Sequence, residues 1–104
     1  MKIRMDDLYS VYVSLNEMFG EKMSPTCAML VMDLRDKVEQ LLKENSRPRK
    51  RTDTTFVFDK NKEVDNGSLP ILNIEQMNGM ILTPEQMRAF KRVFAFTAAQ
   101  RLLD

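Results

Sequence analysis

The side chains that most often perform catalysis are nearly absent from this chain. Among its 104 residues there is no histidine and one cysteine, Cys27. Histidine is the usual general acid and base near neutral pH, and it activates most nucleophilic cysteines. Carboxylate pairs are present, such as Asp6 with Asp7 and Asp33 with Asp36, but no surrounding motif indicates the pocket that acid–base catalysis by two carboxylates requires. We therefore expect a protein that is not an enzyme.

Four cations lie within five residues and are the first candidate for binding chemistry: Arg47, Arg49, Lys50 and Arg51. A guanidinium group can bind a phosphate with two parallel hydrogen bonds, so this run is a candidate contact for a phosphate or an acidic partner. The alternative is a solvated loop after a helix, where positive charge is favourable near the helix C-terminus. The net charge of +1 creates no overall field that would attract nucleic acid.

No cofactor or metal motif is recognisable. The chain lacks a P-loop, a dinucleotide-binding fingerprint and the spacing of zinc ligands. The stretch 59–63 lacks the turn glycine of a calcium loop and has no terminal glutamate at the right offset. Cys27 lies on the apolar stripe of a predicted helix, so we expect a packed thiol. We expect neither a cofactor nor a metal ion.

The first 45 residues are predicted to form a helical hairpin after a short strand at 2–5. Asp6 or Asp7 is the predicted cap of the first helix, and Gly20 is its predicted end. Ser24 and Pro25 start the second helix, since serine caps well and proline suits the first turn. Apolar residues then recur in steps of four and three at Cys27, Val31, Leu34, Val38 and Leu41.

The rest of the chain alternates turn signals with β-like runs and ends in a helix. The basic loop covers 46–53. In the β-rich segment 54–82, the runs 54–58 and 69–74 flank a polar turn and predict a hairpin, with a third short strand at 80–82. Thr83, Pro84 and Gln86 form a capping box that starts a helix over 83–104. The length supports a single domain over 1–104, and the order of elements predicts an α+β fold.

The last helix has more apolar side chains than one face can hold, which predicts a contact with another chain. A domain of this size has difficulty covering such a helix on all sides. We therefore expect a partner groove or a homo-oligomer, with these residues at the contact: Met87, Phe90, Phe94 and Phe96. Most of the nine methionines are expected to fill the core, and some of Met23, Met29 and Met32 are alternative interface residues.

The beginning of the chain resembles small phage and prophage accessory proteins. The similarity covers about the first 45 residues: Met1-Lys2-Ile3-Arg4-Met5-Asp6-Asp7-Leu8-Tyr9, then Tyr12, Leu15-Asn16-Glu17-Met18 and Lys22-Met23-Ser24-Pro25. Those proteins also begin with a short segment of this kind, followed by two helices. The resemblance supplies no catalytic residues, and it implies a protein that acts by binding a phage or host protein.

The sequence as a whole favours a non-catalytic protein–protein interaction module. The expected partner is a host protein, inhibited as in anti-defence, or a phage assembly component. A nucleic-acid-binding accessory protein that uses the Arg47–Arg51 loop is the alternative. The first residues lack the pattern of a secretory signal, and no apolar run is long enough to span a membrane, so we expect a cytoplasmic protein without membrane contact.

Overall fold

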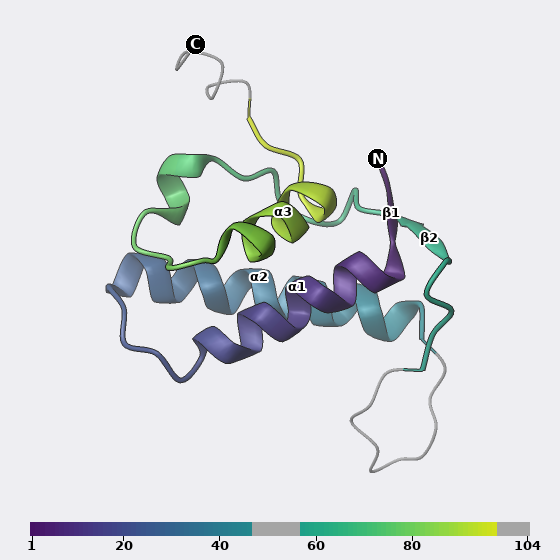
Figure 1. Ribbon diagram of the computed structural model, residues 1–104, viewed down its shortest axis with the longest axis horizontal. Coiled ribbons are helices and arrows are strands. Elements are labelled where there is room, and N and C mark those ends of the chain that lie inside the picture. Colours follow the sequence, from purple (N-terminus) through teal and green to yellow (C-terminus); the bar gives the residue numbers. More distant parts are fainter. Residues whose placement is uncertain (47–56, 98–104) are drawn as a thin grey trace.

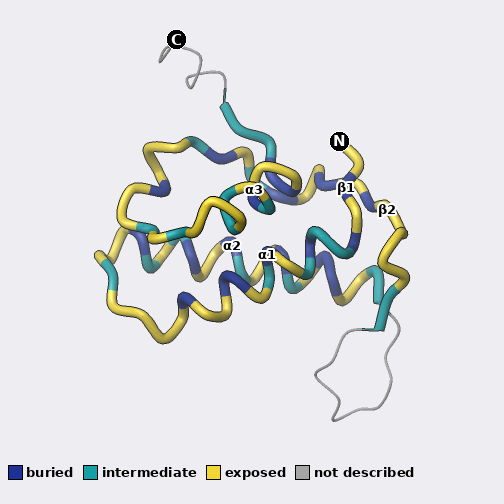
Figure 2. Tube along the Cα trace, viewed as in Figure 1, coloured by how far each residue is buried: buried dark blue, intermediate teal, exposed yellow. Residues whose placement is uncertain are grey.

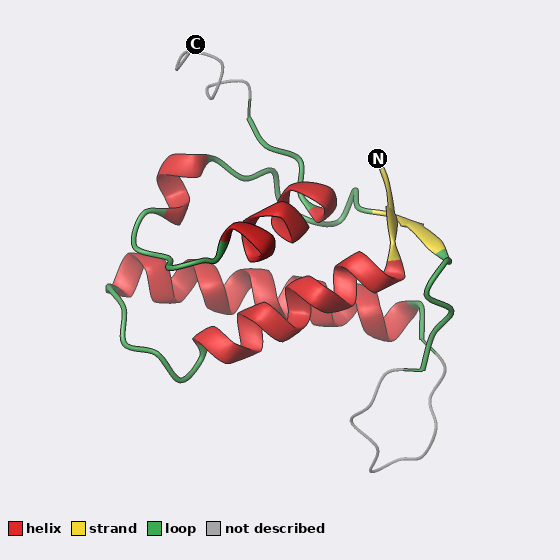
Figure 3. Ribbon diagram, viewed as in Figure 1, coloured by secondary structure: helices red, strands yellow, loops and turns green. Residues whose placement is uncertain are grey.

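The computed structural model describes residues 1–46 and 57–97. In chain order these residues form strand β1 (Lys2–Arg4), helices α1 (Met5–Met18) and α2 (Pro25–Glu44), strand β2 (Glu63–Asp65), the 3₁₀ helix η1 (Ile74–Met77) and helix α3 (Pro84–Val93) (Figure 1). The two strands form one small antiparallel sheet, and the predicted α+β class is confirmed. Figure 3 shows the helices side by side and the sheet at one end.

Helix α1 begins directly after the first strand, two residues earlier than the capping pattern predicts. Its N-cap residue is Arg4, which makes no side-chain capping bond. Instead, the N–H of Met5 donates to the carbonyl of Lys62 at 2.9 Å, so the segment beside the strand satisfies one end group of the helix. Asp6 and Asp7 lie in the first turn, where negative charge is favourable beside the helix N-terminus.

Helix α2 begins at the predicted cap and completes the predicted hairpin. The side chain of Ser24 accepts the N–H of Cys27 at 3.3 Å, and Pro25 occupies the first helical position. Polar contacts join Tyr12 to Glu39 and Asn16 to Arg35. Moving four residues forward along α1, from Tyr12 to Asn16, corresponds to moving four residues back along α2, from Glu39 to Arg35. The two helices therefore run antiparallel.

The sheet is small and antiparallel as predicted, but its strands are not the predicted ones. Strand β1 pairs with β2, with Ile3 opposite Val64 and both side chains buried. The hairpin between 54–58 and 69–74 was therefore a wrong prediction for its described part, because residues 63–65 pair with the beginning of the chain instead. Residues 80–82 form no strand, and 54–56 lie outside the described residues. The predicted turn is present, since the N–H of Leu69 donates to the carbonyl of Asn66.

Helix α3 is shorter than the predicted helix over 83–104. It ends at Val93, and Phe94 has extended backbone angles (φ −102°, ψ 143°). The side chain of buried Asn66 donates to the carbonyl of Val93 at 2.7 Å, which satisfies the helix end. The chain then runs beside Leu72, whose N–H donates to the carbonyl of Ala95 at 2.8 Å. Residues 98–104 lie outside the described residues.

One apolar core joins all the elements, and α3 is part of it. Helix α3 packs on α1 and on β1, while η1 packs on α2. Phe90 and Val93 are fully buried, and Phe94 is 1% exposed. The expectation that this chain could not cover the apolar excess of its last helix is therefore wrong for Phe90, Val93 and Phe94, whereas residues 98–104 lie outside the described residues. The helix is only ten residues long, and it packs on α1 and β1, which cover its apolar face.

Candidate partner-binding groove

The structure separates the four residues expected at the apolar contact. Phe90 and Phe94 pack against each other in the core, with ring centroids 5.6 Å apart and the rings tilted by 38°, so neither offers a surface to a partner. Phe96 lies after the helix, half-buried against the core. Met87 is half-buried and lines a surface hollow. Of the four, Met87 is the residue placed at an open site.

Two hollows adjoin on the surface around Met80. Together they are lined by more than half of the methionines of the chain. The first, of about 580 Å³, lies between η1 and the start of α3. The second hollow, of about 290 Å³, lies between residues 79–81, in the loop that joins η1 to α3, and the end of α1. Gly79 and Met80 line both hollows. We call this surface the methionine groove, after the five of nine methionines that line it: Met18, Met23, Met77, Met80 and Met87.

Two reciprocal capping boxes fix the elements on either side of the groove loop, residues 78–82. At η1, the N–H of Glu75 donates to Oδ1 of Asn73 (2.8 Å), and the N–H of Asn73 donates to Oε1 of Gln76 (3.0 Å). At α3, the N–H of Gln86 donates to Oγ1 of Thr83 (3.1 Å), and the N–H of Thr83 donates to Oε1 of Gln86 (2.9 Å). The α3 box therefore fixes the helix start that follows the loop directly, and the η1 box fixes the start of the short helix that precedes the loop.

Gly79 places the groove loop against the start of α2. Its φ of +100° is a conformation that side-chain-bearing residues rarely adopt. A Cβ at this position would be 3.7 Å from Cβ of Cys27, which is ordinary contact, so the constraint is the backbone angle and not lack of space. The predicted turn at Asn78-Gly79 is confirmed, and it sets where Met80 enters both hollows.

The groove combines buried methionines at its base with exposed aliphatic side chains at its edges. Met18 and Met77 are each 7% exposed, whereas Met80 is half-buried. Ile81, which lines the second hollow, is 91% exposed, and Ile74, which lines the first, is 40% exposed. Figure 2 shows the exposed loop between η1 and α3. Flexible thioether side chains beside exposed aliphatic ones can adapt to varied apolar partners.

The charged residues of the groove are mainly acidic. Glu75 lines the first hollow, while Glu17, Glu21 and Lys22 line the second. Within residues 1–46 and 57–97, none of the three carboxylates forms an ion pair. In contrast, two carboxylates of α2 are paired at 3.0 Å, Asp33 with Lys37 and Glu39 with Lys43. The groove thus presents three carboxylates without an ion-pair partner among the described residues, and Lys22 offsets one of their charges.

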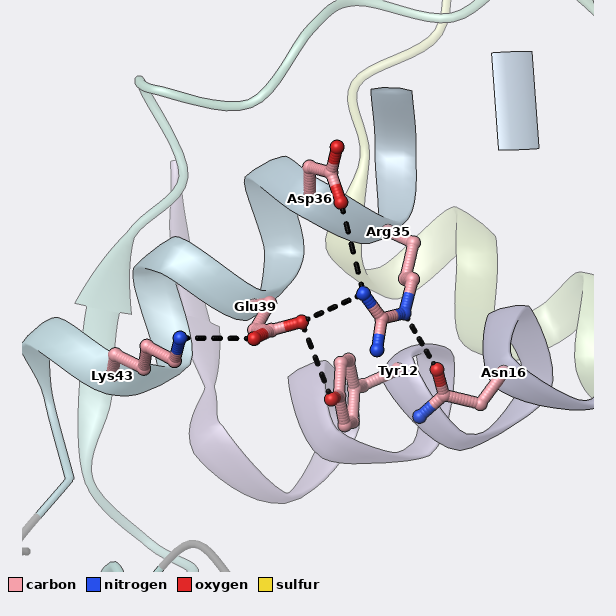
Figure 4. Close-up of polar contacts among 6 residues, drawn as sticks. All are labelled: Tyr12, Asn16, Arg35, Asp36, Glu39 and Lys43. Atoms are coloured by element: carbon pink, nitrogen blue, oxygen red, sulfur yellow. Dashed lines mark hydrogen bonds and ion pairs between the residues drawn. The ribbon is translucent and has the colours of Figure 1, made fainter. Parts of the chain in front are cut away.

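A polar cluster bridges α1 and α2 away from the groove (Figure 4). Nε of Arg35 donates to Oδ1 of Asn16 at 2.7 Å, and its Nη1 lies 3.0 Å from Oε2 of Glu39. The guanidinium carbon also lies 5.0 Å from the ring centroid of Phe19 and 5.7 Å from that of Tyr12. Since every polar partner lies within the hairpin, this cluster holds α1 and α2 together.

Glu39 is the charge centre of that cluster. The Lys43 ammonium, which lies 3.0 Å from Oε1, lowers the pKa of the Glu39 carboxyl, and Arg35 lowers it further. Partial burial opposes this effect, but the pKa remains below its ordinary value. Glu39 is therefore a structural anion and not a group that would hold a proton for catalysis near neutral pH.

A second exposed apolar area lies on the hairpin. Met29 is 70% exposed, Met32 is 55% exposed and Phe19 is 49% exposed. The antiparallel register places Phe19 level with Met32, while Met29 lies one turn nearer the start of α2. Met29 and Met32 are two of the three methionines that the sequence offers as alternative interface residues. The third, Met23, lies elsewhere and lines the groove. None of the described hollows includes Met29 or Met32.

The other sequence predictions concern the thiol, metal binding, membrane contact and the basic run. Cys27 is 1% exposed, which confirms a packed thiol. The described residues contain no cluster of histidine, cysteine or carboxylate side chains that could hold a metal ion. No described helix has the length and apolar character needed to cross a membrane. The basic run lies outside the described residues, so phosphate binding stays a prediction for Arg47, Arg49, Lys50 and Arg51.

Comparison of the chain with protein-family models, curated proteins and solved structures returned no match. The function must therefore be argued from the site itself. Sequence reasoning named Met87 and, among the alternative interface residues, Met23, but it missed Met18, Met77 and Met80, because the groove methionines come from three separate segments. One local signal was available: Asn73 and Gln76 have the same spacing as Thr83 and Gln86, and both pairs form capping boxes.

Proposed function

We propose that this chain is a non-catalytic protein-binding module and that the methionine groove is its binding surface. The observation that carries the proposal is the meeting of five methionines and exposed Ile81 around one capped loop. Half-buried thioethers can rearrange around an incoming apolar side chain at little conformational cost. The occupant is a segment of another protein that inserts apolar side chains into the two hollows.

The biological setting remains part of the same proposal. The similarity of the first 45 residues to phage and prophage accessory proteins favours a phage-encoded protein that acts in the host cytoplasm. Its partner would be a host protein that it inhibits or a phage protein with which it assembles. A homo-oligomer stays a prediction, now without the support of an uncovered last helix, since Phe90 and Phe94 are buried within the chain.

Selection from a random peptide library on the immobilised protein tests the proposal without assuming a partner. The selected peptides are then added to protein labelled with ¹³C in its methionine methyl groups, so each methionine reports contact. We expect peptides with apolar anchor residues, and we expect them to shift the groove methionines Met77, Met80 and Met87. Met29 serves as an internal control, because it is exposed but lies outside the groove.

Either of two results would count against the groove as the binding surface, and a third would count against the apolar chemistry of its occupant. One is the absence of any peptide enriched over a blank surface. The other is a set of shifts confined to Met29 and Met32, which would move the binding surface to the outer face of α2. Binding to the groove by peptides that lack apolar residues would contradict the stated chemistry of the occupant.

A further inference from the structure

We infer that the occupant of the methionine groove is an amphipathic helix whose apolar face is flanked by lysine or arginine residues. This inference rests on the proposed function and adds the chemistry of the partner. It depends on two independent features of the groove: the charge of its rim and the kind of backbone in its walls.

The charge of the rim selects the flanking residues of the partner. Three glutamates and one lysine line the hollows, which leaves two negative charges in excess when all four are ionised. Glu17, Glu21 and Glu75 are exposed and have no ion-pair partner among the described residues. A cationic flank would meet carboxylates that are available, whereas an acidic flank would meet like charge.

The walls of the groove select the backbone conformation of the partner. The hollows are lined by α1, η1, α3, the link after α1 and the groove loop. The described strands, β1 and β2, lie at the other end of the molecule (Figure 1). An extended segment therefore finds no sheet edge in the groove to pair with. A helix satisfies its own backbone hydrogen bonds and needs only side-chain contacts, and an amphipathic helix in an apolar groove is a recurring mode of peptide recognition.

The inference can be tested with designed helical peptides that differ only in charge. Three peptides share one apolar face of leucine and phenylalanine and carry lysine, glutamine or glutamate at the flanking positions. We expect the lysine peptide to bind about ten-fold more tightly than the glutamate peptide at low salt, with the ratio decreasing as salt screens the charges. Equal binding of the three peptides would overturn the inference and leave the proposed function intact.

A pair of charge variants shows whether the preference comes from the rim. Glu21→Gln with Glu75→Gln removes one carboxylate from each hollow and should decrease the lysine-to-glutamate ratio to about three-fold or less. Glu44→Gln with Glu63→Gln removes the same charge at the end of α2 and the start of β2, which lie at the opposite end of the molecule (Figure 1), and should leave the ratio unchanged. An equal decrease in both double variants would show that net charge, and not the groove, sets the preference, and would overturn the inference.

Failure of the two proposals gives different results. If library peptides bind the groove but show no preference for lysine, the charge inference fails alone. If extended peptides locked against helix formation bind as tightly as the helical ones, the helical inference fails alone. If no apolar peptide of any charge shifts Met77, Met80 or Met87, the proposed function itself fails.

Discussion

Gly79 lies against Cys27, and this contact joins the groove loop to the first turn of α2. A Cβ on Gly79 would be 3.9 Å from Sγ of Cys27 and 4.0 Å from Oγ of Ser24, the residue that caps α2. The same glycine lines both hollows. The loop that shapes the binding surface therefore lies against the helix start that Ser24 and Pro25 signal in the sequence.

Gly79→Ala should destabilise the fold although there is room for the methyl group. At φ +100° a non-glycine residue is strained, and such strain costs about 1–3 kcal/mol. The midpoint of urea unfolding should decrease accordingly. Gly20→Ala is the matched control, because a Cβ at Gly20 meets nothing within 4 Å and its φ is not positive. Equal effects of the two variants would show that the backbone angle of Gly79 is not the constraint.

Phe90 should contribute to stability and not to binding, contrary to what the sequence predicts. It is fully buried, so Phe90→Ala should lower the free energy of unfolding by about 3–5 kcal/mol, a large part of the stability of a small domain. Val93→Ala is a milder variant if that protein does not fold. Ile81→Ala, at a side chain that is 91% exposed, should change stability by less than about 0.5 kcal/mol. Urea unfolding measures all three, and a small loss for both buried variants would contradict the assigned core.

The hairpin cluster predicts a dependence of stability on pH. Because the folded pKa of Glu39 lies below its unfolded value, the unfolded state takes up the proton first as the solution becomes acidic. The stabilisation from Glu39 is fully present above the ordinary glutamate pKa of about 4.3 and decreases below it. Unfolding free energies of the wild type and of Glu39→Gln should therefore converge between pH 7 and pH 3. A difference that stays constant over this range would show that the charge of Glu39 is not what stabilises the hairpin.

The sequence predicts the elements whose signals are local. Ser24 with Pro25, and Thr83 with Gln86, begin helices where the capping patterns place them, because the bonds lie within four residues of each other. The start of α1 was missed because the preceding residues pair with β2, about 60 residues away in the chain. Local patterns cannot report such a partner.

The end of α3 and the groove could not be predicted for the same reason. Val93 ends the helix where Asn66, 27 residues earlier, donates to its carbonyl. The apolar residues after Val93 continue a helical pattern, but the backbone bonds to Leu72 override it. The groove methionines lie at the end of α1, in the link after it and between 77 and 87, so only the tertiary fold brings them together.

The central claim is that the methionines of the groove, and not exposed methionines in general, bind the partner. The most direct test compares two double variants for their affinity toward the library-selected peptide. Met80→Gln with Met87→Gln makes the groove polar, and Met29→Gln with Met32→Gln makes the same change on the outer face of α2. Urea unfolding first confirms that each variant is folded.

We expect the groove variant to weaken binding by at least about ten-fold, since two buried apolar contacts of about 1 kcal/mol each would be lost. The α2 variant should bind like the wild type. Unchanged affinity in the folded groove variant, or an equal loss in both variants, would contradict the account.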